Sequence, residues 1–306
     1  MSKRNYPLII GSLLTIAFVI IAIVGPLLAP IDPMERFSDV IRDSEGNMYI
    51  PSVRPLPPFT LNMFPLGTDN AGRDIFSRLL WAVRPTLVAC TAVVLGRLLI
   101  AVPLGLLVGW FQESWFDRLT NGLTSIIVAI PQLILAIAII ALSEERELSL
   151  FIAVLTLIGW PDMMQYIRNQ TRITSKAEFI ESAQSIGATT PAILRRHIFP
   201  QLWPALPSLI AFELSAVLLL FAELGFLGFF IGNGYVIFGA DPNSAGVIAT
   251  GLTSGTPELG QMLSDFWAKI FESPWEMVSA ATVIFLMVFG FNLLGEGLRR
   301  QMDITR

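Results

Sequence analysis

Four ionisable side chains interrupt long apolar stretches of the chain: Arg97, Asp162, Glu213 and Glu223. For Asp162 a structural position near a helix end is favoured, and the other three are the candidates for a solute path. A charge that lies in hydrocarbon is costly, so such groups usually face protein or a water-filled cavity and often mark the path of a solute or ion. The alternative is a structural role, in which the charge fixes helix packing. The structural role is favoured for Arg97 and Glu213. For Glu223, which stands in a glycine-containing stretch that permits close helix approach, the two roles have equal weight.

A second group of polar residues lies between two apolar stretches, in the segment 168–204. This segment is too polar to cross a membrane and predicts two short helices. Ser175, with Glu178 three residues later, has the pattern of a capping box at the start of the first helix. Gly187 is a natural stop for its C-terminal end.

The first of these short helices is amphipathic. Phe179, Ala183 and Ile186 follow one another at spacings of four and three residues and share one face. A short amphipathic helix can dock into a groove on a partner protein. It can also be a linker that lies on the membrane surface, and periodicity alone favours the linker.

The sequence contains no motif that would indicate an enzyme. The lysines are Lys3, Lys176 and Lys269, and none of them follows a glycine as a phosphate-binding loop requires. There is one cysteine, Cys90, and one histidine, His197, which excludes zinc sites built from several such ligands. The sequence therefore predicts no catalytic residue, no metal site and no cofactor in this chain.

The composition indicates a membrane protein. The chain has 306 residues, of which 54% are hydrophobic and 14% charged, whereas soluble domains carry about 25% charged residues. The net charge of −4 gives no basic surface for nucleic acid. So much apolar surface requires a second apolar solvent, and the lipid bilayer supplies it.

Six stretches are apolar over the roughly 20 residues that a bilayer-spanning helix needs. Their continuous apolar character favours helices over the alternating strands of a membrane barrel. The first is expected to be a retained anchor and not a cleaved signal peptide. The predicted spans are Leu8–Leu28, Thr86–Phe111, Leu119–Leu142, Leu148–Ile167, Pro204–Ile231 and Trp275–Leu298.

The distribution of basic residues predicts the orientation. With six spans, both termini and the segment 168–204 lie on the same side of the membrane, and all three are rich in lysine or arginine. The positive-inside rule makes that side cytoplasmic. The loops on the opposite side carry acidic residues, and one of these loops is the segment 232–274.

The segment 168–204 resembles a known family. Glu181-Ser182-Ala183, then Gly187, then Ile198-Phe199-Pro200 is similar to the "EAA" loop of binding-protein-dependent ABC importer permeases. In that family the loop forms a coupling helix that sits in a cleft of the ATPase subunit. Ser182 and Phe199 depart from the family pattern, which has alanine and leucine there. The resemblance implies ATPase-coupling roles for Glu178, Phe179, Glu181, Ser182, Ala183, Ile186 and Gly187.

Further segments resemble the dipeptide, oligopeptide and nickel branch of these permeases, in the order of its second, "C"-type, subunit. Any one segment alone is a weak signal, whereas the ordered set covers the chain from about residue 66 to its end. The matching segments are Leu66–Asp74, Val102–Gly105, Gly159–Pro161, Arg196–Pro200, Glu223–Gly228 and Phe291–Arg299.

The resemblance implies an all-α polytopic membrane protein with six transmembrane helices and a cytoplasmic coupling helix, the type I ABC importer permease (MetI-like) architecture. It implies a bacterial inner-membrane location. The implied partners are a second homologous permease, two ATP-binding subunits that hold ATP and Mg²⁺, and an extracytoplasmic solute-binding protein. Peptides are the leading substrate, with nickel or oligosaccharides as alternatives. A gradient-driven secondary transporter and a non-transporting scaffold are rival hypotheses, although no internal repeat supports the former.

The predicted organisation has three parts. Residues 1–29 form a tail and the first span, 30–85 an extracytoplasmic segment, and 86–306 the permease core. Within the outer segment, residues 41–58 predict an inserted hairpin. Asp69 is expected to cap the helix that leads into the second span.

In the outer loop 232–274, Thr256 and Pro257 are expected to start an amphipathic helix. Its apolar stripe is predicted to run from Leu259 to Phe271. Packing on the chain's own surface, or lying in the interface, is favoured over contact with a binding protein.

Overall fold

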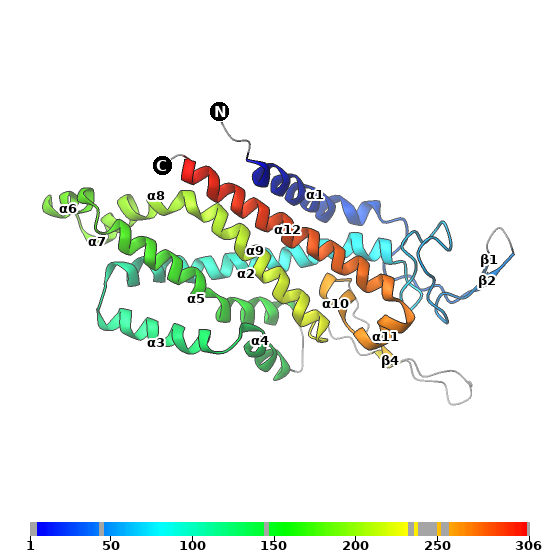
Figure 1. Ribbon diagram of the computed structural model, residues 1–306. Helices are drawn as coiled ribbons and strands as arrows, with labels where there is room; N and C mark the ends of the chain where they lie inside the picture. The colour runs from blue at the N-terminus through cyan, green and yellow to red at the C-terminus, as the bar shows by residue number, and fades with distance from the viewer. Residues whose placement is uncertain are drawn as a thin grey trace.

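The computed structural model describes residues 5–42, 46–143, 147–231 and 257–304, with the short strands 236–237 and 250–251. Within that part of the chain the protein is an elongated bundle of helices (Figure 1). Five helical runs are long and apolar enough to cross a membrane, and one bent pair supplies a sixth candidate. The all-α prediction is therefore confirmed, and five of the six predicted spans correspond to continuous helical runs, whereas the third corresponds to the bent pair.

The centre of the bundle is made by two long helices, α2 (Ile75–Trp110) and α5 (Leu148–Thr174), which pack along each other. The N-terminal α1 (Tyr6–Leu28) lies against both α2 and the C-terminal α12 (Pro274–Ile304). The fifth helix, α9 (Leu206–Phe226), packs between α12 and α2 (Figure 1).

The predicted third span is not one straight helix. It divides into α3 (Trp115–Ala129) and α4 (Gln132–Ala141), which are bent by 84° relative to each other. Pro131 stands at the break, and Ile130 before it is extended, with φ −100° and ψ 128°. A proline lacks the N–H of a helical hydrogen bond and disfavours helical geometry in the residue before it, which explains the bend.

Three other predicted boundaries move. The helix α2 begins at Ile75, so the boundary predicted at residue 86 falls inside a helix. The helix α5 continues past Ile167 to Thr174. The helix α9 ends at Phe226, before the predicted Ile231, because Gly228 at φ +83° lets Phe229 N–H donate back to the Leu224 carbonyl and close the helix.

The end of the bundle beyond α5 carries the predicted pair of short helices. The first is α6 (Glu178–Ser185) and the second is α7 (Thr190–Ile193). A π-helical turn η1 (Leu194–Ile198), α8 (Phe199–Leu202) and a 3₁₀ turn η2 (Trp203–Ala205) then lead into α9. Figure 1 shows α6 projecting at this extreme end of the molecule.

The opposite end holds the segments that the sequence predicts to be extracytoplasmic, and we call them the outer segments. An antiparallel hairpin, β1 (Ile41–Arg42) and β2 (Met48–Tyr49), confirms the hairpin predicted within residues 41–58. A second pair, β3 (Val236–Ile237) and β4 (Thr250–Gly251), belongs to the loop 232–274. The centre of the first turn, most of that loop, and the predicted cap Thr256 lie outside the described residues.

The predicted outer amphipathic helix is two helices, α10 (Leu259–Leu263) and α11 (Phe266–Glu272). Asp265 between them has a left-handed φ of +58°, which interrupts the helix. Every residue of α10 is buried, Gln261 included, against α9, α12 and α2. The apolar stripe is therefore split, and its first part packs inside the protein.

Buried charges join these outer segments. Asp69 accepts hydrogen bonds from the backbone N–H groups of Ala71 and Arg73, and its second oxygen lies 2.7 Å from Arg73 Nε. Arg78 Nε lies 3.5 Å from the same carboxylate, and Arg78 Nη2 donates to Gln261 of α10 at 2.8 Å. We call Asp69, Arg73, Arg78 and Gln261 the outer hub.

The structure around the outer hub corrects one local prediction. The N-cap of α2 is Asp74, whose carboxylate accepts from Ser77 N–H at 2.8 Å, and not Asp69. Burial alone would raise the pKa of Asp69, but Arg73 and Arg78 hold it below its usual value. Asp69 is thus a buried carboxylate that compensates two buried guanidinium groups.

Replacing Asp69 with alanine is expected to destabilise the protein strongly. The change leaves Arg73 and Arg78 buried without their counter-charge, which costs about 3–5 kcal/mol for a broken buried pair. Thermal unfolding of the purified protein in detergent measures the effect. Asp39→Ala, which removes an exposed carboxylate from the same outer segment, is the control and is expected to leave the unfolding temperature nearly unchanged. Equal unfolding temperatures for the two variants would contradict the role of the hub.

Candidate functional site

The short helix α6 divides its side chains between the protein interior and solvent. Ile180 is fully buried and Ala183 is 6% exposed, and both pack in a cluster with residues of α5 such as Met164. Phe179 and Ile186 remain exposed, at 44% and 86%. The other predicted coupling residues are exposed too: Glu178, Glu181, Ser182 and Gly187.

The predicted stripe is therefore split. Ala183 faces the chain's own core with Ile180, while Phe179 and Ile186 stay free at the tip of the molecule. The spacing of four and three residues is compatible with either face, and only the place of α6 in the apolar cluster that it shares with α5, α7 and η1 decides between them. What α6 offers to solvent is an apolar pair beside two carboxylates.

The predicted capping box is absent. The N-cap of α6 is Ala177, which has no capping side chain. Ser175 instead ends α5, where its hydroxyl donates to the Arg172 carbonyl at 3.0 Å. The first turn of α6 is stabilised instead by Glu178 and Glu181, because carboxylates interact favourably with the positive end of a helix dipole.

The predicted stop at Gly187 is confirmed. Its φ is +81°, a conformation that glycine adopts without steric cost. Gly187 N–H donates to the Gln184 carbonyl at 2.9 Å and Ala188 N–H to the Ala183 carbonyl at 3.0 Å. These two bonds form a Schellman motif, which fixes the direction in which the chain leaves α6.

An ion cluster holds the base of this helical arm to the bundle. Asp117, in the first turn of α3, forms ion pairs with Arg168 and Arg172 on α5, and the Arg172 pair measures 2.8 Å. Asp117 also accepts from Asn121 at 2.8 Å. The signal in the sequence is two arginines one helical turn apart at the end of α5, whose charge by itself predicts only the orientation of the segment.

Two of the predicted path residues pair with each other. Arg97 of α2 lies 2.9 Å from Glu213 of α9, and the two side chains are 3% and 12% exposed. Arg97 also donates to the Leu155 carbonyl of α5 at 3.0 Å. A Cβ at Gly159 of α5 would overlap the guanidinium, so glycine there makes room for it. The pair ties three helices together, as the structural alternative predicts.

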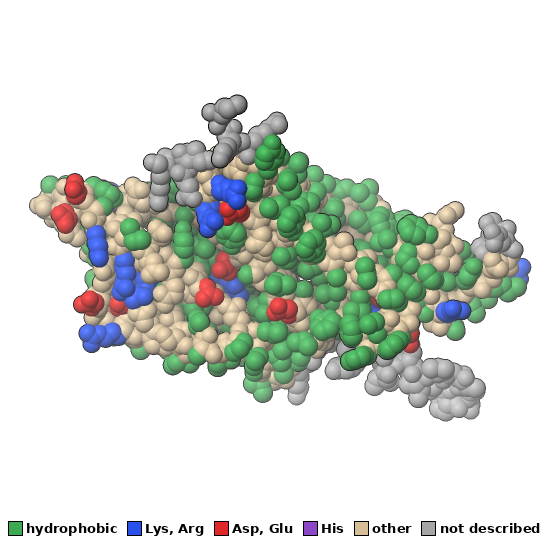
Figure 2. All heavy atoms as spheres, viewed as in Figure 1, with side chains coloured by type: hydrophobic (Ala, Val, Ile, Leu, Met, Phe, Trp, Pro, Cys, Tyr) green, Lys and Arg blue, Asp and Glu red, His purple; other side chains and the backbone are tan. Residues whose placement is uncertain are grey.

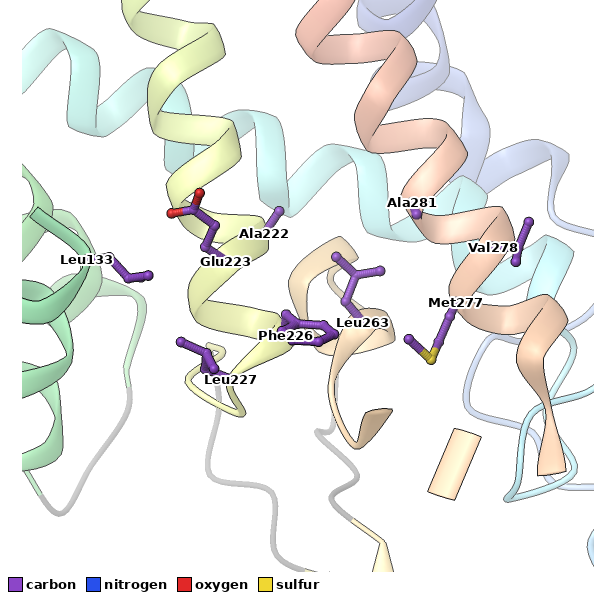
Figure 3. Close-up of a pocket in the computed structure, with 9 residues that line it drawn as sticks. All are labelled: Leu133, Ala222, Glu223, Phe226, Leu227, Leu263, Met277, Val278 and Ala281. Carbon is purple, nitrogen blue, oxygen red and sulfur yellow. The ribbon is translucent and has the colours of Figure 1, made fainter. Parts of the chain in front are cut away.

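Glu223, the third predicted path residue, has a different environment. It lies on the wall of a cavity of about 630 Å³ and is half-buried. Among the described residues, no hydrogen bond or ion pair reaches its carboxylate. The lining residues belong to α4, α9 with its C-cap residue, α10 and α12. Figure 3 shows them around Glu223. The other lining residues are Leu133, Ala222, Phe226, Leu227, Leu263, Met277, Val278 and Ala281.

The outer side of this cavity is formed by α10, which contributes Leu263. The helix lies against α9 at Gly225, where a Cβ would overlap the backbone of Gly260. Close helix approach beside Glu223, predicted from the glycines, is therefore confirmed for Gly225. The glutamate at 258, which the sequence analysis did not single out, caps α10: its carboxylate accepts from Gly260 N–H at 3.0 Å and from Gln261 N–H at 3.2 Å.

Residues 101–303 match the family described as "Binding-protein-dependent transport system inner membrane component". The chain belongs to this family. The match runs from the last turns of α2 to α12 and includes the arm that carries α6, so the resemblance expected from the segment 168–204 is confirmed.

The chain is also similar along almost its whole length to curated members of the family. It is 31% identical to the glutathione transport system permease protein GsiD of Pectobacterium atrosepticum, over 98% of this chain and 87% of the relative. It is 30% identical to the dipeptide transport system permease protein DppC of Alkalihalophilus pseudofirmus, over 98% of this chain and 86% of the relative.

A solved structure shares the fold. A chain of the MetNI methionine ABC transporter, in an inward-facing conformation, aligns with a TM-score of 0.53 at 18% identity. The alignment covers 75% of this chain and 97% of that one. The type I, MetI-like architecture expected for this permease is therefore confirmed as a fold.

The cap of α10 predicts a pH-dependent stability. Burial raises the pKa of Glu258 to about 7, against a lowering by the backbone N–H groups of Gly260 and Gln261. The folded state then binds the proton more tightly than the unfolded state, in which the pKa of this carboxyl is near 4.5. This contribution to stability is complete below pH 4.5 and is lost as the pH rises through 7.

Glu258→Gln is therefore expected to flatten the fall in unfolding temperature between pH 5 and pH 8, because glutamine does not ionise. The loss in the unmodified protein over this range is on the order of 3 kcal/mol, from 1.36 kcal/mol for each pKa unit. Unfolding scans in detergent at several pH values measure it. The exposed Glu272→Gln is the control. An unchanged pH profile in Glu258→Gln would rule out this titration.

Proposed function

We propose that this chain is one of two permease subunits that together form the path for peptides across the bacterial inner membrane. Two separate ATP-binding subunits drive it, and an extracytoplasmic solute-binding protein delivers the substrate. The observation that carries the proposal is α6, a short rigid helix at one end of the bundle with Phe179 and Ile186 exposed.

The exposed surface of α6 supports docking on an ATPase subunit. Phe179, Ile186, Glu178, Glu181 and Ser182 provide the contact surface, apolar side chains flanked by acidic ones. Ala183 does not contact the partner but packs α6 against the core, and Gly187 fixes the direction in which the chain leaves α6. Because Ile180 and Ala183 of α6 belong to the same apolar cluster as residues of α5, movement of an attached ATPase is transmitted to the membrane helices rather than absorbed in a loose linker.

The distribution of charge supports a cytoplasmic location for α6 and for both termini. Lysine and arginine side chains gather at the end of the molecule that bears α6, the left end in Figure 2. Figure 1 shows that α1 begins and α12 ends on the same side of the bundle. The positive-inside rule then orients the hairpin β1–β2 and the outer hub toward the exterior.

ATP hydrolysis belongs to the partner subunits in this proposal, with ATP and Mg²⁺ bound there. The sequence has no phosphate-binding loop. ATP binding closes the ATPase pair and favours the outward-facing state of the permeases, and hydrolysis returns them inward. This is a two-state equilibrium that a partner shifts through α6.

Peptides are proposed as substrate because the relatives are named for dipeptide and glutathione transport. The complex of this chain with its partner permease, ATPases and binding protein, reconstituted in liposomes, tests the proposal. Uptake of a labelled dipeptide is expected to require both ATP and the binding protein. Uptake driven by an ion gradient, with this chain alone, would refute it in favour of a secondary transporter.

Gly187→Val is expected to uncouple ATP hydrolysis from uptake. Valine is strained at φ +81°, so the Schellman motif is disrupted and α6 changes its orientation toward the ATPase. Uptake should fall by about tenfold or more while ATP hydrolysis and membrane insertion persist.

Gly46→Val is a matched control for this change. Gly46 has a similar φ of +88° and, like Gly187, has open space where a Cβ would lie, but it stands in the outer hairpin. The Gly46→Val substitution therefore imposes the same backbone strain as Gly187→Val, but at a site distant from α6. Normal coupled uptake by Gly187→Val, or equal loss in both variants, would contradict the coupling role.

A further inference from the structure

The cavity beside Glu223 has the size and wall chemistry of a small-molecule site. Its volume of about 630 Å³ falls within the roughly 300–1,000 Å³ of ligand pockets in proteins. The cavity extends from Leu133 of α4, past the outer end of α9, to Met277 and Ala281 of α12 (Figure 3). Apart from Glu223, every lining side chain is apolar.

Glu223 is a carboxylate for which the described part of the chain provides no counter-charge. The contrast with Glu213 on the same helix is direct, because Arg97 lies 2.9 Å from that carboxylate. Glu276, buried at the start of α12, likewise has Lys269 at 3.0 Å. These two carboxylates are thus compensated by a cation, whereas no cation of the described chain pairs with the one on the cavity wall, which is left for a ligand. A half-buried charge in apolar surroundings is stabilised by a cation that binds it.

We propose that this cavity is a transit site for an ammonium-bearing peptide, with Glu223 as the counter-ion of the peptide's free amino terminus. The inference rests on the proposed function and specifies the chemistry of its substrate. The apolar walls contact the side chains of the passing peptide. Because they provide no hydrogen-bonding groups that select one side chain, the site recognises the amino terminus, which peptides share.

The charge argues for a peptide over a lipid chain or a helix of a partner as the occupant. An acyl chain or an apolar helix face would fill the walls but leave the carboxylate against hydrocarbon, at a cost of several kcal/mol. A solute with a cation on an apolar body satisfies both features at once.

The outer wall of the cavity is held in place by the outer hub. Leu263 belongs to α10, whose Gln261 accepts from Arg78 of the outer hub at 2.8 Å. The cavity therefore lies directly beneath a segment that is attached to the extracytoplasmic side, as a site that receives solute from that side requires.

Uptake by the reconstituted full transporter tests the role of the charge. Glu223→Gln keeps the shape of the side chain and removes its charge, and is expected to lower the initial rate of ATP-driven alanyl-alanine uptake by about tenfold. Glu223→Asp should restore part of the rate. Glu35→Gln, which neutralises an exposed carboxylate of the outer segment, is the matched control and should transport normally.

A labelling experiment tests whether the peptide occupies the cavity. Cys90 is the only cysteine and is fully buried, so Ala281→Cys provides the accessible thiol of this chain. In the purified full complex without ATP or binding protein, excess alanyl-alanine should slow maleimide labelling at position 281, measured by mass spectrometry of this chain. N-acetyl-alanyl-alanine, and the peptide on a Glu223→Gln background, should not slow it.

The outcomes separate this inference from the function on which it rests. If the unmodified complex imports the peptide and Glu223→Gln does so equally fast, the transit site is refuted and the function stands. If Glu223→Gln loses uptake but position 281 is labelled at the same rate with and without peptide, Glu223 acts through structure and the site is refuted. If no ATP-driven uptake occurs in any variant, the proposed function fails, whereas the ATP-free labelling still decides whether peptide binds here.

Discussion

Hydrocarbon offers no hydrogen-bond partner and little stabilisation of charge, and this constraint determines the organisation of the protein. Backbone groups within the membrane must pair inside their own segment, which restricts the spans to helices. Ionisable side chains must find partners on neighbouring helices. The Arg97–Glu213 pair meets this requirement and joins α2 to α9. The bond from Arg97 to the Leu155 carbonyl adds α5 to the same centre.

The two ends of the bundle use paired charges for different purposes. At the end that bears α6, Asp117 forms ion pairs with Arg168 and Arg172, which fixes α3 against the base of the arm. At the outer end, the Asp69 carboxylate compensates the charges of Arg73 and Arg78. Arg78 also donates a hydrogen bond to Gln261 of α10. Each cluster attaches a short segment outside the spans to the long helices.

Between the two ends lies a cavity whose charge is not compensated within the described chain. Its walls belong to α9 and α12, which also pack along each other, and to α10 and α4. The bend at Pro131 separates α4 from α3, so the wall that contains Leu133 begins just after a break in a span. A relative movement of α3 and α4 would change this wall without breaking a continuous helix.

Much of the fold could be predicted from the sequence because hydrocarbon length and helical period act locally. The positions of the apolar stretches determined the spans, apart from the bend at Pro131 and ends displaced by local capping. Gly187 was identifiable as a helix stop because the property that ends the helix, the steric freedom of glycine, is local to that residue. The two hydrogen bonds of the Schellman motif confirm this stop. The ordered segments between Leu66 and Arg299 determined the family, which the match over 101–303 confirms.

The tertiary structure decided what depends on contacts between distant segments. Whether Ala183 or Phe179 faces the core follows from how α6 packs in the apolar cluster at the end of α5, and periodicity could not separate them. The pairing of Arg97 with Glu213 joins residues from different helices, so no local pattern encodes it. The same holds for Glu223. Its sequence neighbours indicated close packing, but its place on a cavity wall, without a partner among the described residues, depends on where four helices meet. Sequence determines which groups are costly to bury, and tertiary packing determines which of them are paired.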